Sequence, residues 1–138
     1  MYFNATAVID LSSDNYVFYN AGKNGNGIKV VIGANVTKIP TYLFYPSFSS
    51  PKITSVEFEE GSVCESIGEY AFSSCQLLTN VSLPHSVEYI GEYAFRGCSN
   101  LTSVTIGNGV TTIGSWAFGY CSNLTRVTIG NGVTTIGS

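Results

Sequence analysis

The chain repeats itself every 23 residues, and this repeat limits the fold more than any other feature. The clearest copy is IGEYAFRGCSNLTSVTIGNGVTT at residues 90–112, and residues 113–135 repeat it as IGSWAFGYCSNLTRVTIGNGVTT. Residues 67–89 are a more diverged copy, and another copy begins at Ile136. Self-similarity at a fixed period of about 20–50 residues is typical of a solenoid, in which stacked coils share a core that no single coil could bury.

The repeat also predicts how the chain is divided. A fainter copy of the pattern begins at Ile28, and the step from Ile39 to Ile67 is five residues longer than the 23-residue period. We place about three of these extra residues near 46–51 and two at 59–65, because solenoids accept insertions in corner loops. Residues before the array resemble a degenerate first coil, which is expected of a terminal repeat that shields the core. The predicted organisation is a capping segment at 1–26 and an array at 27–138, made of an irregular coil at 39–66, regular coils at 67–89, 90–112 and 113–135, and a stub at 136–138.

Each regular coil is predicted to contain one strand, one corner and one turn. Val104 and Ile106 alternate with Thr105, so the two apolar side chains face the core and the threonine points outward. The chain then turns a corner and returns along the opposite side as an extended or loosely helical segment. A short helical or 3-10 turn at 114–118 buries its alanine and phenylalanine. Stacked coils place equivalent strands side by side in a parallel sheet, about 4.8 Å apart.

The composition supports a packed core and excludes two classes of partner. Hydrophobic residues make up 44% of the chain, whereas charged residues make up only 11% and give a net charge of −3. Lysine and arginine form no cluster, so the chain lacks the electrostatic surface that nucleic acids or anionic membranes require. No apolar run approaches the roughly 20 residues that cross a bilayer. We therefore expect no nucleic-acid partner and no membrane insertion.

The recurring cysteines and the single histidine predict packing rather than chemistry. Cys75, Cys98 and Cys121 recur at the period and form a column whose parallel side chains disfavour both a disulfide and a zinc site with convergent ligands. We expect these thiols to be buried as small apolar groups, while Cys64 in the irregular coil is free or pairs with Cys75. His85 has no serine or cysteine nucleophile in a catalytic arrangement. The sequence therefore predicts no catalytic residue, no cofactor and no metal site.

Two kinds of segment recur along the array. The first kind is LTNVSLPHSVEYI at 78–90 and LTSVTIGNGVTTI at 101–113, and the second is IGEYAFSSC, IGEYAFRGC and IGSWAFGYC at 67–75, 90–98 and 113–121. Together they resemble the leucine-rich repeat family, in particular its BspA-like (Treponema pallidum-type) subclass, whose units of about 23 residues have the form LxxLxLPxxLxxIGxxAFxxCxx. Gly107 and Gly130 stand where that subclass has proline.

The resemblance covers roughly residues 28–138 and implies a repeat solenoid. This would be a right-handed leucine-rich-repeat coil with a parallel β-sheet on one face and short helical or 3-10 turns or extended segments on the other. It also implies a non-catalytic protein, at a cell surface or secreted, that acts in adhesion or protein binding. The first residues show neither the basic start nor the apolar run of a signal peptide. Either the chain is cytosolic or it is a fragment whose leader has been cut away. The stop at Ser138, two residues into a new repeat, favours a fragment or an array that is completed by something else.

Differences between coils mark candidate contact residues, because packing fixes the core positions. One set points outward on the predicted strands, the face that solenoids use for binding, and comprises Ser55, Glu57, Asn80, Ser82, Ser103, Thr105, Arg126 and Thr128. A second set lies on the turn segments and comprises Tyr70, Tyr93, Trp116, Arg96 and Tyr120. The Tyr/Trp column either edges the core with its polar tips in water or contacts a ligand. Four of the five differences between coils 90–112 and 113–135 lie on the turn segment, which favours the second set.

These observations favour a binding scaffold that acts in adhesion or protein–protein recognition. The expected partner is a protein of a host or of a cell surface, with a glycan as the second option. The alternative is a structural protein that forms homo-oligomers through the ends of the solenoid. A last coil without a polar cap exposes a strand edge that can pair with another copy.

Overall fold

The computed structural model describes residues 2–3, 27–45 and 52–138. The predicted capping segment and the insertion at 46–51 therefore lie outside the described residues, apart from one strand. That strand, β1 (Tyr2–Phe3), pairs in parallel with β2 at the start of the array. The described part of the chain is thus almost entirely the repeat array.

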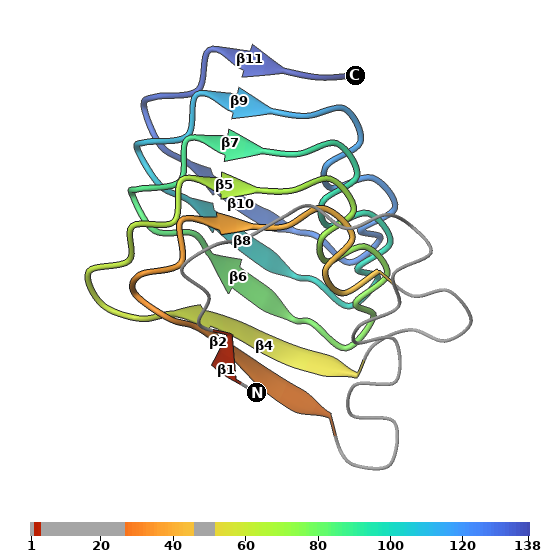
Figure 1. Ribbon diagram of the computed structural model, residues 1–138. Helices are drawn as coiled ribbons and strands as arrows, with labels where there is room; N and C mark the ends of the chain where they lie inside the picture. Colours follow the sequence, from red (N-terminus) through yellow and green to blue (C-terminus); the bar gives the residue numbers. More distant parts are fainter. Residues whose placement is uncertain (1, 4–26, 46–51) are drawn as a thin grey trace.

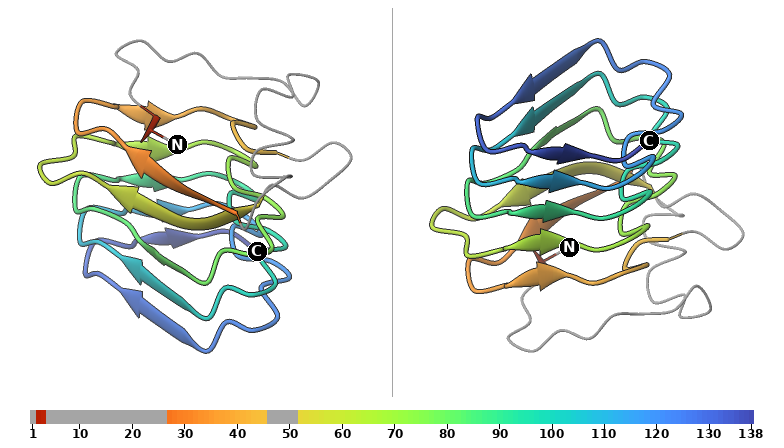
Figure 2. Two further views of the ribbon diagram at one scale, coloured as in Figure 1. Left: turned by 90° about the horizontal axis from the view of Figure 1, so that it is seen from below. Right: turned by 90° about the horizontal axis from the view of Figure 1, so that it is seen from above.

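The array folds as a solenoid with two parallel sheets (Figures 1 and 2). The large sheet has the strand order β1-β2-β4-β6-β8-β10, and the small sheet has the order β11-β9-β7-β5-β3. The further strands of the large sheet are β2 (Ile28–Ile32), β4 (Ile53–Phe58), β6 (Asn80–Ser82), β8 (Ser103–Ile106) and β10 (Arg126–Ile129). Those of the small sheet are β3 (Lys38–Ile39), β5 (Ser66–Ile67), β7 (Tyr89–Ile90), β9 (Thr112–Ile113) and β11 (Thr135–Ile136). The predicted solenoid is confirmed, and the side opposite the long strands is extended rather than helical.

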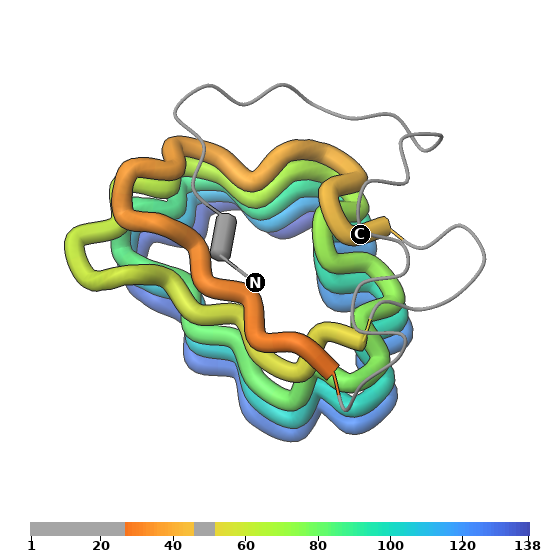
Figure 3. Tube along the Cα trace, turned by 60° about the horizontal axis from the view of Figure 1, so that its bottom comes forward, coloured from red at the N-terminus to blue at the C-terminus, as the bar shows by residue number. Residues whose placement is uncertain are grey.

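Each coil makes one turn around the core, as the view along the stack in Figure 3 shows. In one coil, β6 is followed by a corner at 83–88, then by β7, and then by a turn segment at 91–98 that leads back to the large sheet. The corner and the turn segment occupy opposite ends of the coil. The yellow-green loop between β4 and β5 extends beyond the other coils at the corner end. This is the position at which the sequence predicts two extra residues.

Neighbouring strands pair residue for residue at the repeat period. Val81 of β6 lies opposite Val104 of β8, and Ser82 lies opposite Thr105. Val104 and Ile106 are buried while Thr105 between them is exposed, as predicted. The large sheet therefore presents one apolar face to the core and one polar face to solvent.

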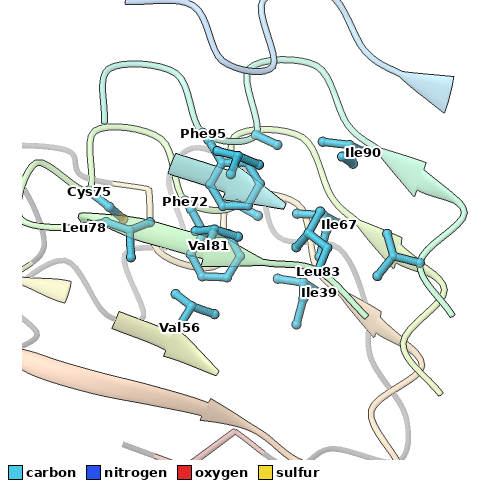
Figure 4. Packing of buried hydrophobic residues seen from close by; sticks show 14 of the residues in the cluster. Ile39, Val56, Ile67, Phe72, Cys75, Leu78, Val81, Leu83, Ile90 and Phe95 are labelled. Carbon is cyan, nitrogen blue, oxygen red and sulfur yellow. The ribbon is translucent and has the colours of Figure 1, made fainter. Parts of the chain in front are cut away.

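The core consists of columns of equivalent side chains (Figure 4). The rings of Phe44, Phe72, Phe95 and Phe118 stack along the array with successive centroids 5.2, 5.2 and 5.4 Å apart. The first three rings are fully buried. Burying such a side chain contributes about 1.5–3 kcal/mol, so this column is a main source of stability. In the last coil, β10 and β11 are exposed along their length.

The turn segments combine hydrogen bonds within a coil with bonds between coils. The N–H of Ala94 donates to the carbonyl of Gly91 in the same coil, whereas the N–H of Phe95 donates to Ala117 of the next coil. This alternation produces a series of turns instead of a continuous helix. It buries Ala94 and Phe95, whereas in the predicted turn at 114–118 the alanine is buried and Phe118 is half-buried. Among the described residues, no helix has the length and apolarity needed to cross a membrane.

Candidate functional site

The two predicted sets of contact residues lie on different sides of the coil. The outward side of the large sheet, which we call the strand face, carries Ser55, Glu57, Asn80, Ser82, Ser103, Thr105, Arg126 and Thr128. The side chains of the turn segments form what we call the aromatic edge, which carries Tyr42, Tyr45, Tyr70, Tyr93, Arg96, Trp116 and Tyr120. The structure therefore brings the members of each set together but does not join the two sets.

The strand face is polar and mostly uncharged where the coils are regular. The register aligns one row of Asn80, Ser103 and Arg126 and a second row of Ser82, Thr105 and Thr128. All six side chains are exposed except Ser103, which is half-buried. Lys29 of β2 and Glu57 of β4 form an ion pair with a nitrogen–oxygen distance of 2.6 Å. Both side chains are more than half exposed, so this pair contributes at most about 1 kcal/mol.

Three tyrosines of the aromatic edge are stacked face to face. The ring centroids of Tyr42 and Tyr70 are 5.0 Å apart with planes at 6°, and those of Tyr70 and Tyr93 are 4.7 Å apart at 16°. Tyr45 meets the first two rings edge-on. Because each ring covers the face of its neighbour, the stack offers ring edges and hydroxyl groups for contact rather than open ring faces. Burial raises the pKa of Tyr42 and of Tyr70 above the ordinary tyrosine value. Tyrosine hydroxyl groups are protonated at neutral pH in any case, so both can donate hydrogen bonds.

Arg96 connects this stack to an exposed aromatic pair in the next coil. Its guanidinium carbon lies 4.8 Å from the ring centroid of Tyr120 and 5.9 Å from that of Tyr93, within the range of cation–π attraction. Tyr120 in turn stacks on Trp116 at 5.8 Å, and these two side chains are 65% and 49% exposed. No carboxylate is paired with Arg96 among the described residues. The described part of the chain therefore surrounds this guanidinium with aromatic rings and not with a carboxylate.

The backbone under the aromatic edge is left-handed, which the sequence does not indicate. Tyr70, Tyr93 and Trp116 have φ values of 54°, 57° and 55°. This conformation costs an L-residue roughly 1–2 kcal/mol. A hydrogen bond to the next coil offsets part of that cost. For example, the N–H of Tyr93 donates to the carbonyl of Ser115 at 3.0 Å. Such strain persists where the surrounding structure enforces it, and here it fixes the direction of the aromatic side chains. A second left-handed position follows four residues later, at Ser74, Gly97 and Tyr120.

A cleft of about 550 Å³ opens on the strand face between β4 and β6. Three predicted contact residues line it, namely Glu57, Asn80 and Ser82. The rest of the lining comes from Val56, Phe58, the loop at 59–62 and the corner at 83–86. Sequence reasoning missed this cleft because no single repeat position marks it. Two signals point to it in retrospect, which are the longer loop after β4 and a proline at the corner of the next coil.

The cysteines act as packing residues. Cys75 and Cys98 are fully buried and Cys121 is half-buried, and the thiols of Cys98 and Cys121 each donate to a phenylalanine carbonyl of the preceding coil at 3.3 Å. The predicted column of buried thiols is thus confirmed for its first two members. Cys64 lies outside this column, at the position that Val87 takes in the next coil, and all four thiols are free. Burial raises the pKa of every thiol, to about 11 for Cys64, so the reactive thiolate is disfavoured.

His85 takes part in a ladder of hydrogen bonds at the corner. Its Nδ1 accepts from the backbone N–H of Asn108 at 3.2 Å, and the Oδ1 of Asn108 accepts from the N–H of Asn131 at 3.3 Å. The histidine thus supplies the acceptor that asparagine supplies one coil later. Within the described ranges 2–3, 27–45 and 52–138, no three His, Cys, Asp or Glu side chains are close enough together to hold a metal ion.

Comparison with known proteins matches the repeat to one family. The BspA type leucine rich repeat region matches residues 46–138 in six copies. Among solved structures, the chain is similar to a leucine rich cell surface protein from Faecalibacterium prausnitzii, with 27% identity and a TM-score of 0.64 over 73% of this chain and 25% of that one. It is also similar to a leucine rich repeat protein from T. pallidum, with 28% identity and a TM-score of 0.59 over 80% of this chain and 60% of that one. The chain therefore spans only part of either protein, and no curated protein matches it significantly.

Proposed function

Because this chain belongs to the BspA-type leucine-rich repeat family, we propose that it recognises a protein partner at a cell surface through its aromatic edge. Leucine-rich repeats are protein-interaction scaffolds, and solenoids of this kind bind over extended surfaces. A surface location is supported by the similar protein from Faecalibacterium prausnitzii, which is described as a cell surface protein. The role is adhesion or recognition without catalysis, which is typical of the family.

The observation that carries this proposal is the arrangement of Arg96 between two aromatic rings, with no counter-ion among the residues that the structure describes. The rings of Tyr93 and Tyr120 restrict the guanidinium, so a partner does not have to pay the full entropy of ordering a long side chain. The adjoining Trp116 and Tyr120 offer exposed apolar area. Trp, Tyr and Arg are the residue types that dominate measured binding energy at interfaces, with costs of about 2 kcal/mol or more on truncation.

The partner that fits this edge presents a carboxylate beside an apolar side chain. A carboxylate accepts two parallel hydrogen bonds from a guanidinium, and this geometry is stronger than a single neutral bond. The apolar neighbour covers the exposed faces of Trp116 and Tyr120. The strand face offers no comparable cluster, because its regular rows are composed of short polar side chains interrupted only by Arg126.

A glycan fits the same edge less well. Sugar rings pack on open aromatic faces, whereas the faces of Tyr42, Tyr70 and Tyr93 cover one another at 4.7–5.0 Å. Trp116 and Tyr120 are the most exposed aromatic side chains of this edge. A glycan partner would therefore contact one coil, while a protein partner can follow the edge across several.

The proposal is tested by binding to a panel of purified extracellular proteins, with three forms of the chain compared by biolayer interferometry. The edge variant carries Arg96→Ser and Tyr120→Ser. These substitutions copy Ser73 and Ser74, which take the same two positions in the coil at 67–89, and Ser74 adopts a φ of 59° like that of Tyr120. The matched strand-face variant carries Thr105→Lys and Arg126→Glu, at two exposed positions outside the cleft between β4 and β6.

We expect a protein that binds the wild type to bind the edge variant at least tenfold more weakly, because two hot-spot side chains are lost. The strand-face variant should bind within about twofold of the wild type, because exposed charges at the rim contribute little. Circular dichroism and thermal unfolding of each variant show that the fold is retained. Binding that survives in the edge variant and is lost in the strand-face variant would assign recognition to the strand face instead.

A second candidate function is self-assembly through the last coil. Val127, Ile129 and Ile136 are 45%, 47% and 64% exposed, although the equivalent Val104, Ile106 and Ile113 of the preceding coil are buried. A second copy stacked on this coil would cover these side chains and pair with β10 and β11. Light scattering at millimolar concentration distinguishes the two functions. A strict monomer rules out assembly and leaves partner recognition unaffected.

A further inference from the structure

The large sheet is split between β4 and β6. These strands are paired at one position only, Val56 with Val81, whereas β6 and β8 are paired at three positions and β8 and β10 at four. Beyond Val56, β4 continues to Phe58 in register with β2, while β6 remains in register with β8. The two halves of the sheet therefore separate at their C-terminal ends, and the cleft of about 550 Å³ lies in that separation.

The sequence provides a physical reason for the split. At the corners that follow β4 and β10, Glu59 and Gly130 donate their N–H groups to the carbonyls of Ile32 and Ile106 in the preceding coil, both at 3.0 Å. Pro84 occupies the same corner position in its own coil and has no N–H. The carbonyl of Phe58, which is equivalent to those of Ile32 and Ile106, is thus left without its donor from the next coil.

The walls of the cleft are held by hydrogen bonds to both neighbouring coils. The Oε2 of Glu59 accepts from the N–H of Ala34 at 2.8 Å, and the N–H of Val63 donates to the carbonyl of Ala34 at 3.0 Å. On the other side, the hydroxyl of Ser86 donates to the carbonyl of Cys64 at 2.8 Å. The protruding loop after β4 is therefore fixed relative to the strands on either side. A ligand would enter a formed cleft and would not have to order the loop.

The lining combines an apolar base with an acidic rim. Val56, Leu83 and Pro84 supply apolar surface, and Phe58 is half-buried beside them. Glu57, Glu59 and Glu60 line the same cleft, whereas none of the lysines and arginines that the structure describes does. Lys29 forms an ion pair with Glu57, whereas Glu60 is exposed with no ion pair or hydrogen bond found among the described residues. The cleft therefore complements a ligand that has a flat or aliphatic body and a positively charged end.

We propose that this cleft binds an arginine side chain of a protein partner. The guanidinium group is planar and has five N–H donors, so it can bond to a carboxylate and to a backbone carbonyl at the same time. In the cleft these acceptors are the carboxylates of Glu57 and Glu60 and the carbonyl of Phe58. The aliphatic part of the side chain packs against Leu83 and Pro84. This site is separate from the aromatic edge and does not rest on the partner proposed for that edge.

The test uses a small probe and residue-resolved detection. The N-acetylated, C-amidated tripeptide Gly-Arg-Gly is titrated into the labelled chain, and backbone amide shifts are followed by two-dimensional NMR. The control peptide replaces arginine with citrulline, which has nearly the same shape and no charge. We expect saturable shifts at residues 57–62 and 82–86 with the arginine peptide, and at least tenfold weaker binding with citrulline.

Two variants separate charge from shape. Glu60→Gln should weaken binding of the arginine peptide roughly fivefold or more, whereas Glu88→Gln, on an exposed site outside the cleft, should leave it unchanged. Pro84→Gly copies Gly107 and Gly130 and restores the missing N–H without changing any charge, so pairing of β4 with β6 should lengthen and binding should fall by a similar factor. Equal binding of the two peptides, or shifts that lie outside the cleft, would overturn the proposal. So would unaltered binding by both the Glu60 and the Pro84 variants.

Discussion

The buried thiol of Cys64 should make the protein lose stability at alkaline pH by an amount that can be calculated. This side chain is 0% exposed, and burial raises its pKa from 9.0 to about 11. The folded chain therefore keeps the proton at a pH at which the unfolded chain releases it. The stability due to the neutral thiol is fully present below about pH 9 and is lost between about pH 9 and pH 11. The difference between these two pKa values corresponds to about 2.7 kcal/mol of stability, and about 2 kcal/mol of this is lost by pH 10.5.

The matched variant is Cys64→Val, because Val36, Val87 and Val110 occupy the same position in other coils and are fully buried there. We expect this variant to be within about 1 kcal/mol of the wild type at pH 7, since the substitution nearly conserves volume. Between pH 7 and pH 10.5, the difference in free energy of unfolding between variant and wild type should move by about 2 kcal/mol in favour of the variant. Urea unfolding at several pH values measures the difference, and the other buried thiols cancel because both proteins contain them. Unfolding free energies that remain parallel from pH 7 to pH 10.5 would refute this reasoning.

Three further outcomes follow from the packing and the backbone. A thiol reagent added to the native chain at pH 8 should modify Cys121 first, because the other three thiols are fully buried. Modification of all four thiols at one rate would contradict this burial. Gly97→Ala should lower the free energy of unfolding by about 1 kcal/mol, because Gly97 has a φ of 75°, which alanine adopts only at a cost. Ser74→Gly, at the equivalent position, should leave the free energy of unfolding unchanged or raise it. Chemical denaturation measures both changes. Phe95→Ala should lower the free energy of unfolding by about 3–5 kcal/mol and Phe118→Ala by clearly less, because Phe95 is fully buried and Phe118 is half-buried. Equal losses in chemical denaturation would mean that the coil at 113–135 is packed as well as the middle of the array.

Most of the fold could be predicted from the repeat. The alternation of Val104, Thr105 and Ile106 identifies the strand and its inward face, and the fixed period implies parallel pairing of equivalent strands. The form of the turn segment could not be predicted. Tyr, Trp and Ser rarely adopt a positive φ, and here hydrogen bonds to the next coil impose it at Tyr93 and Trp116. That cause lies in the stacking of coils and is absent from any single unit.

The candidate sites were predictable to different degrees. Arg96 and Tyr120 were found because they differ between two otherwise similar coils, but their contact across 23 residues of sequence depends on the stacking. The cleft was missed because it depends on two neighbouring irregularities, the longer loop after β4 and the missing N–H of Pro84. Each is ordinary alone, and only together do they separate two strands of one sheet. The assignments of individual contact residues remain predictions.

The central claim is that a protein partner is recognised at the aromatic edge, and the single tryptophan of the chain reports on that edge directly. The measurement is a titration of the labelled chain with a partner that binds it, followed through the indole N–H signal of Trp116. Because this side chain is 49% exposed and stacks on Tyr120 beside Arg96, the account predicts that the signal shifts and saturates with the affinity found for the whole chain. An indole signal that stays unchanged at saturation, while amides of Asn80, Ser103 and Arg126 shift, would contradict it.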